Sequence, residues 1–154
     1  MQRLAVLLST CVYVGYFPIA PGTAGSAAGL LVCWALRHVE SPALEVATII
    51  ALFLVGMWSA TEAERYFGTP DPGPVVLDEV VGILITLAFI PMGWNVALLG
   101  FFVFRVFDVV KPYPSPRFER WPGGLGVMAD DAMAGIYANL VVRGGMALMP
   151  TWFA

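Results

Sequence analysis

The chain contains several long apolar segments that lack charged residues. Residues 4–36 and 80–104 contain no charged side chain, and residues 46–61 form a shorter stretch of the same kind. A membrane-spanning helix needs about 20 mainly apolar residues, or about 17 at the lower limit. Helices that cover a soluble core are apolar on one face only, whereas residues 46–57 are apolar all round. The pattern therefore predicts a membrane protein with about five membrane-embedded helices, some of them short.

Clusters of proline and glycine separate these segments and are typical of turns and loops. The clusters lie at residues 18–22, 41–42, 70–74, 91–95 and 112–126. Between them the pattern predicts helices at 24–39, 43–66, 76–91, 95–111 and 128–149, with residues 3–17 as a candidate additional N-terminal helix. No internal repeat or low-complexity linker interrupts the chain. We therefore expect residues 1–154 to form one all-α domain, a small polytopic membrane helix bundle.

The segment 80–104 decides the topology. As a single helix it would place Asp78 and Glu79 on the opposite side of the membrane from Asp108. The Pro-Met-Gly-Trp-Asn sequence at 91–95 instead favours a hairpin of two short helices, with an interfacial tryptophan at the turn. The hairpin brings the acidic residues to one face together with most of the basic residues, so the positive-inside rule predicts that this face is cytoplasmic.

Overall charge excludes one class of partner. The net charge is −3 and the eight basic residues form no stripe, so the chain lacks the electrostatic footprint of a nucleic-acid-binding protein. Cys11 and Cys33 match no metal-ligand spacing and are expected to be packing residues. The sequence gives no indication of a protein partner.

Five carboxylates are predicted to converge on the cytoplasmic face. Asp78 and Glu79 open one predicted helix, Asp108 closes the next, and Asp130 and Asp131 open the last. A single acid at a helix start can simply complement the helix dipole and cap free amides. That explanation does not account for adjacent pairs, or for Asp108 near a helix C-terminus. Because ionisable residues at membrane depth are costly, the set indicates a functional site.

Two basic residues share a stripe with Asp108. Arg105, Asp108 and Lys111 recur at a spacing of three, which is compatible with an internal ion ladder or with Arg105 and Lys111 binding a phosphate group. Five carboxylates against two cations leave an excess of negative charge that a divalent cation would neutralise. Magnesium (Mg2+) accepts carboxylate and phosphate oxygens in one coordination shell. The candidate metal ligands are Asp78, Glu79, Asp130 and Asp131.

A glycine-rich segment at residues 20–26 precedes a predicted helix. Its free amides, with Gly22 and the hydroxyl groups of Thr23 and Ser26, are candidates for phosphate binding. Gly25 and Gly29 have the small-residue spacing that more often indicates close helix packing in membranes. The glycines at 123–126 allow either close approach of a ligand or a tight turn.

Four segments taken in order resemble the phosphatidylglycerophosphatase A family of bacterial membrane phosphatases. They are residues 21–26, 71–82, 104–114 and 123–135, and the similarity extends over about residues 15–140. The resemblance implies an all-α fold in the bacterial cytoplasmic membrane. It also implies magnesium-dependent hydrolysis of phosphatidylglycerophosphate, a membrane phospholipid, to phosphatidylglycerol and inorganic phosphate.

The residue chemistry agrees with metal-assisted hydrolysis. The single histidine, His38, is predicted on the opposite face, and the cysteines lack a basic neighbour, so a metal remains as the source of catalysis. Asp108 could act as a general base, a further ligand or a nucleophile. The candidate catalytic residues are Asp108, Asp131, Lys111 and Arg105. A membrane phosphotransferase, or a small Mg2+ or other ion transporter, would use the same acidic cluster and is the alternative.

The hairpin yields a testable topology. Thr23, Asp71 and Gly124 are expected on the cytoplasmic face, and Glu40 and Asn95 on the outer face. With single cysteines placed at these sites in a chain without its own cysteines, an impermeant thiol reagent should label only positions 40 and 95 in intact cells. Labelling at position 124 but not at position 95 would contradict the hairpin.

Overall fold

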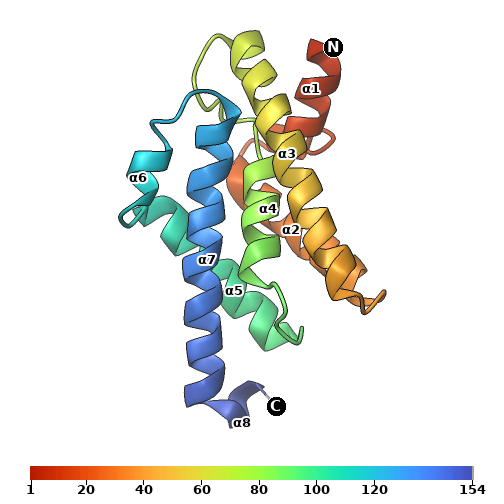
Figure 1. Cartoon of the computed structure of the whole chain (residues 1–154), viewed down its shortest axis with the longest axis vertical. Helices are drawn as coiled ribbons and strands as arrows, with labels where there is room; N and C mark the ends of the chain where they lie inside the picture. Colours follow the sequence, from red (N-terminus) through yellow and green to blue (C-terminus); the bar gives the residue numbers. More distant parts are fainter. Residues whose placement is uncertain (154) are drawn as a thin grey trace.

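The computed structural model describes residues 1–153, and within this range every regular element is a helix. Figure 1 shows the arrangement of these helices. The elements are α1 (Gln2–Ser9), the 3-10 helix η1 (Val14–Tyr16), α2 (Pro21–Arg37), α3 (Pro42–Phe67), α4 (Leu77–Thr86), α5 (Trp94–Val110), α6 (Ser115–Phe118), α7 (Gly124–Leu148) and α8 (Pro150–Phe153). The predicted all-α class is confirmed.

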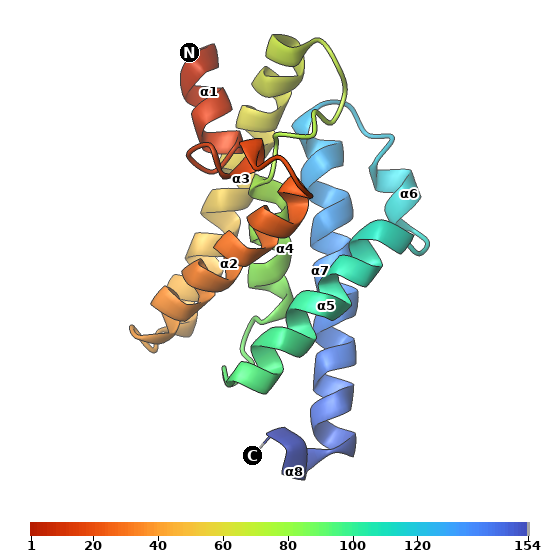
Figure 2. The ribbon, with the colours of Figure 1, turned by 180° about the vertical axis from the view of Figure 1, so that it is seen from behind.

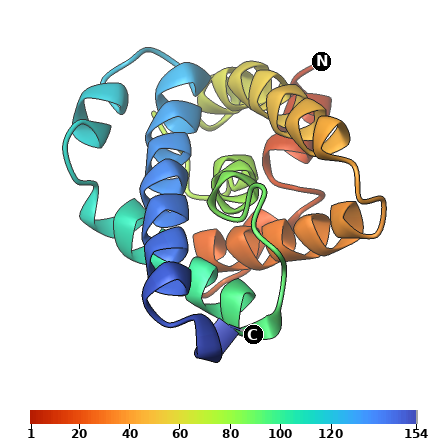
Figure 3. The same ribbon diagram turned by 60° about the horizontal axis from the view of Figure 1, so that its bottom comes forward.

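Helix α4 forms the centre of the bundle. It contacts α2, α3, α5 and α7, and Figure 3 shows these four helices arranged around it. Eight of its ten residues are buried. The apolar sequence of α4 after Glu79 therefore reflects contact with protein on all sides. Its outer neighbours instead leave many apolar side chains exposed, including Leu31, Ile50, Leu54, Phe102 and Leu140.

Small residues allow the outer helices to approach α4 closely. A Cβ atom added to Gly29 of α2 would lie 2.9 Å from the Cβ of Ile83, and one added to Gly25 would lie 2.7 Å from the Cβ of Val76. Gly135 of α7 packs in the same way against the Gly82 carbonyl. The close-packing interpretation of Gly25 and Gly29 is therefore confirmed.

Side chains from α2 and α7 satisfy the C-terminal end of α4, where helical carbonyls lack intrahelical partners. Asn139 Nδ2 donates to three of these carbonyls, and Arg143 donates to one of the same three. Arg37 donates to the Leu87 carbonyl at 2.6 Å and forms an ion pair with the buried Glu45 at 3.0 Å. These contacts fix the end of α4 that is opposite to Asp78 and Glu79.

Two predicted helix boundaries differ from the structure by four or more residues. Helix α4 ends at Thr86, five residues earlier than predicted, and residues 87–93 separate it from α5. The predicted break in the segment 80–104 is thus confirmed. Helix α7 begins at Gly124, four residues earlier than predicted, so placing Asp130 and Asp131 at its start was wrong. The reason is that Gly124 enters the helix, since its amide donates to Thr61 Oγ1 at 2.8 Å.

The N-terminal segment also differs from a single helix over residues 3–17. It forms two helices, α1 and η1. In the turn between them, three consecutive residues have positive φ angles: Cys11, Val12 and Tyr13. Residues other than glycine rarely adopt this left-handed backbone conformation. Here it turns the backbone and places α1 against α3.

Within residues 1–153, two helices, α3 and α7, are long and apolar enough to cross a membrane, fewer than the five predicted. Helices α2 and α5 have 17 residues each, and α4 has only ten. The most apolar part of α3 is mainly exposed, whereas that of α7 is half buried against the bundle. Length and composition therefore support membrane crossing for α3 and α7 alone.

The contact between α2 and α4 can be tested by adding one methyl group. Gly29→Ala should lower the thermal midpoint, because overpacking a close contact costs about 1–3 kcal/mol. Gly144→Ala is the matched control, since Gly144 lies in α7 with nothing within 4 Å of an added Cβ, and alanine favours a helix. The two variants are compared with wild type by thermal unfolding in detergent. Equal midpoints for both variants would contradict the close packing of α2 on α4.

Candidate active site

A pocket of about 260 Å³ lies where the first residues of α2 and α4 meet the end of α5 and the first third of α7. It contains all five predicted acids, both predicted cations and Gly22. Its lining residues are Ala20, Pro21, Gly22, Asp71, Gly73, Val75, Asp78, Glu79, Arg105, Asp108, Lys111, Asp130 and Asp131. The predicted convergence of the carboxylates is therefore confirmed, although α7 contributes its acids from within the helix.

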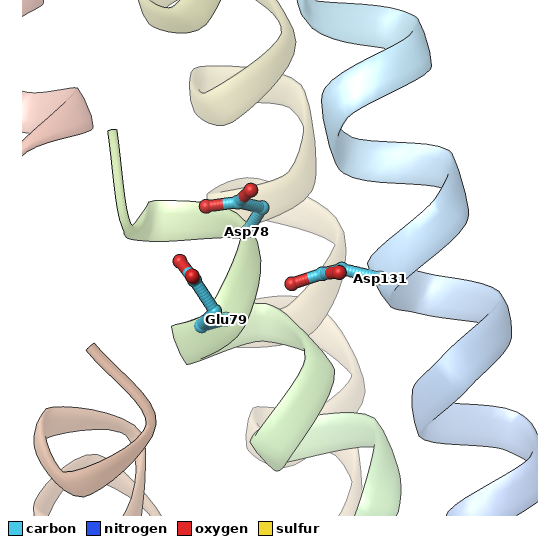
Figure 4. A group of neighbouring side chains, drawn as sticks. All are labelled: Asp78, Glu79 and Asp131. Carbon is cyan, nitrogen blue, oxygen red and sulfur yellow. The ribbon is translucent and has the colours of Figure 1, made fainter. Parts of the chain in front are cut away.

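Three carboxylates in this pocket are close enough to share one cation. One oxygen from each of Asp78, Glu79 and Asp131 lies within 4.8 Å of the other two. Figure 4 shows the three side chains gathered between α4 and α7. Asp78 Oδ1, Glu79 Oε2 and Asp131 Oδ2 are each buried without a hydrogen-bond partner among the described residues. Buried carboxylate oxygens without partners are unfavourable, and a hard divalent cation would satisfy all three.

Arg105 lies between this group and Asp108. Its Nη1 atom is 2.6 Å from Asp108 Oδ2 and 3.7 Å from Glu79 Oε1. One part of the predicted ion ladder, the pair between Arg105 and Asp108, is therefore present. The guanidinium group partly neutralises the acids and lies at the pocket lining, where it could also contact an anion.

Lys111 does not continue the ladder to Asp108. Its backbone adopts the left-handed conformation with φ of 46° and ends α5, so the side chain leaves the helical stripe. Nζ instead donates to Asp130 Oδ2 at 2.6 Å and to Glu119 Oε1 at 3.1 Å. Burial alone lowers the pKa of Lys111, but these two carboxylates raise the pKa above its ordinary value. Lys111 therefore remains positively charged in the pocket.

The three phosphate-binding candidates on α2 have different positions. Gly22 is buried in the pocket lining, where an added Cβ would collide with Glu79 Oε1 and the Arg105 guanidinium. Ser26 is buried, and its hydroxyl donates to the Gly22 carbonyl at 2.8 Å. Thr23 is exposed, and neither it nor Ser26 belongs to the lining. Close backbone approach at Gly22 is thus the contribution of this segment that the structure supports.

Sequence reasoning omitted two acidic residues at or beside the pocket. Asp71 lies in its lining, and Glu119 contacts Lys111 at 3.1 Å. Asp71 opens the Asp-Pro-Gly-Pro segment that contributed to the family resemblance, which is a signal for its inclusion. Glu119 carries no such signal, because its approach to Lys111 depends on the loop and short helix α6 between α5 and α7.

Comparisons with known proteins find relatives that align with most of the chain. The chain is 38% identical to phosphatidylglycerophosphatase A of Haemophilus influenzae over 80% of this chain and 77% of that protein. It is 32% identical to the Escherichia coli protein of the same name, over 79% and 72% of the two chains. It is also 36% identical to a Bacteroides thetaiotaomicron protein provisionally named phosphatidylinositol-3-phosphatase, over 90% and 91%. No solved structure matches the chain.

The family-level comparison covers most of the chain. The phosphatidylglycerophosphatase A family model matches residues 7–146, which include every residue of the acidic pocket. The resemblance found from the four sequence segments is therefore confirmed. The chain belongs to the phosphatidylglycerophosphatase A family and is a phosphatase.

Proposed function

We propose that the acidic pocket hydrolyses phosphatidylglycerophosphate to phosphatidylglycerol and inorganic phosphate with the help of a divalent cation, Mg2+. The observation that carries this proposal is the group formed by Asp78, Glu79 and Asp131, each with one buried oxygen that lacks a partner among the described residues. Six carboxylates and two cations line the pocket, a formal excess of four negative charges. A phosphate group would be repelled by that excess unless a metal neutralised it.

The lipid head group is proposed from the relatives. Two of them are named for phosphatidylglycerophosphate and one for a phosphoinositide. Both substrates are phosphate monoesters on a lipid head group, so the same pocket chemistry serves either. A primary phosphate on a flexible glycerol needs little space beyond the phosphate itself, which suits a pocket of about 260 Å³. We therefore expect a higher kcat/KM for phosphatidylglycerophosphate than for phosphatidylinositol 3-phosphate.

Asp78, Glu79 and Asp131 are the proposed metal ligands. A bound Mg2+ would polarise a phosphate oxygen and make a water molecule more acidic. Asp130 was also a predicted ligand, but its Oδ2 accepts from Lys111 at 2.6 Å and its Oδ1 accepts the Asp131 amide at 3.0 Å. We therefore assign Asp130 to holding Lys111 and the backbone beside Asp131.

The remaining pocket residues are assigned to the substrate and to proton transfer. Asp108, held by Arg105, accepts a proton from the attacking water molecule as the water oxygen bonds to phosphorus. The bond from phosphorus to the glycerol oxygen breaks, and that oxygen then takes up a proton. Arg105 and Lys111 stabilise the charge on the phosphate oxygens. Gly22 leaves room for the phosphate, since any larger residue would occupy the space beside Glu79 and Arg105.

We propose that the bundle lies in the bacterial cytoplasmic membrane, with α2, α4 and α5 as short embedded helices between the longer α3 and α7. The apolar side chains exposed on the outer helices form a surface that water would disfavour. The acidic pocket then opens at the cytoplasmic side. An ion transporter would instead be expected to place its acids near the membrane midplane, whereas Asp78 and Glu79 lie in the first turn of α4.

Metal dependence is the first test of this function. Purified protein should release inorganic phosphate from phosphatidylglycerophosphate with Mg2+ present and lose activity when a chelator removes divalent metal, because the carboxylates then repel the substrate. Restoring Mg2+ should restore the rate. Full activity in the chelator would contradict the proposed metal. A requirement for an added alcohol acceptor would indicate a phosphotransferase instead.

Carboxylate substitutions test the assigned site. Four substitutions should each lower kcat by more than about 100-fold while the yield of folded protein stays normal: Asp78→Asn, Glu79→Gln, Asp108→Asn and Asp131→Asn. The loss of a residue that only hydrogen-bonds to a metal ligand costs about 100-fold at most, so the loss of a ligand itself should cost more. Glu62→Gln is the matched control for Glu79→Gln, because Glu62 pairs with the exposed Arg65 and exposed pairs contribute little. Near-normal turnover of Asp108→Asn and Asp131→Asn at saturating Mg2+ would show that the site is assigned to the wrong residues.

A further inference from the structure

A second pocket, of about 410 Å³, lies outside the acidic site between the last turns of α2 and the start of α5. Its lining residues are Leu30, Leu31, Trp34, Met92, Gly93, Trp94 and Ala97. None of these carries a charge, and Leu31, Trp34 and Trp94 are largely exposed. The pocket therefore presents apolar surface to whatever surrounds the bundle.

Helices α2 and α5 connect this apolar pocket to the acidic one. Figure 2 shows them on the same face of the bundle, α2 in front of α4 and α5 in front of α7, and the two helices contact each other. Helix α2 begins at the acidic pocket and α5 ends there, and an added Cβ on Gly22 would lie 2.9 Å from Arg105 Nη1. The opposite ends of the same two helices line the apolar pocket. We call the surface between α2 and α5 the α2–α5 seam.

One stripe of α5 runs the length of the seam. Trp94, Ala97, Phe101, Arg105 and Asp108 follow one another at spacings of three and four residues, which places them along one face of a helix. The first two line the apolar pocket and the last two line the acidic pocket. The stripe therefore changes from apolar to charged over the eight residues from Ala97 to Arg105, about 12 Å of helix.

One stripe of α2, which meets α5 at the apolar pocket, has a similar gradation. Thr23, Ala27, Leu30 and Trp34 follow at spacings of four, three and four residues, with a hydroxyl at the acidic end and an indole at the apolar end. Thr23 and Ala27 are exposed. Ala27 therefore places a small, exposed side chain at the middle of the stripe, between the two pockets.

We infer that the α2–α5 seam binds one acyl chain of the lipid substrate, with the chain in the apolar pocket and the phosphate in the acidic pocket. This inference rests on the proposed function. An amphiphile matches a surface that is charged at one end and apolar at the other, whereas a helix from a second copy would need apolar contacts along its whole length. The lipid would enter sideways from the bilayer, between α2 and α5.

The test blocks the seam without altering the acidic pocket. Ala27→Trp fills the middle of the seam, and Leu31→Trp provides a second variant in the apolar pocket. Ala51→Trp is the matched control, because Ala51 is an exposed alanine on α3. For each variant, kcat and KM are measured with dipalmitoyl phosphatidylglycerophosphate in mixed micelles and with the soluble dibutyryl substrate. The midpoint of thermal unfolding is compared with that of the wild-type protein.

For Ala27→Trp and Leu31→Trp we expect KM for the dipalmitoyl substrate to rise at least about tenfold, as when roughly two methylene groups lose apolar contact. The kcat for that substrate, both constants for the dibutyryl substrate and all constants of Ala51→Trp should stay near wild type. Unchanged kinetics with both substrates would overturn the inference, and so would equal losses with both. Wild-type protein that hydrolyses neither substrate would overturn the proposed function and this inference with it.

Discussion

The need to compensate buried carboxylates governs the arrangement of this protein. Asp78, Asp130 and Asp131 are all at least nine-tenths buried, and isolated charges in an apolar interior are strongly unfavourable. Arg105 and Lys111 offset part of the charge from the end of α5. The three unpartnered carboxylate oxygens mark the part that protein groups leave uncompensated. The structure therefore leaves an excess of negative charge that a bound cation would neutralise, and such a cation would allow a phosphate to bind beside it.

Helix α4 holds the site because its two ends are fixed in different ways. Its first turn carries Asp78 and Glu79, where negative charge is favoured by the helix dipole. Its last carbonyls accept from Arg37, Asn139 and Arg143, which come from helices on two sides. Positive groups at a helix C-terminus are favoured by the same dipole. These contacts, together with side-chain packing, thus prevent the ten-residue helix from sliding along its axis. Asp78 and Glu79 therefore stay level with Asp131 on α7.

Much of the architecture could be predicted from the sequence because the relevant signals are local. The proline and glycine at 91–93 indicated the break before α5, and the hairpin that follows from this break indicated the convergence of the acidic residues. The start of α7 could not be predicted from its glycines, because Gly124 enters the helix through a contact with Thr61 on α3. Likewise, the spacing of three predicted Lys111 beside Asp108, but the helix ends at Val110 and the side chain turns to Asp130. Both misplacements depend on tertiary contacts.

The shortness of α4 has a consequence for the biogenesis of the protein. When α4 emerges during synthesis, α2 and α3 already exist, but α5 and α7 do not. At that stage half of its surroundings are missing, and Asp78 and Glu79 lack both Arg105 and the rest of the acidic pocket. A ten-residue segment carrying two acids is a poor substrate for independent insertion. In the proposed membrane arrangement, stable integration of α4 would therefore wait for α7, and a truncated chain would be exposed to membrane proteolysis before any site could assemble.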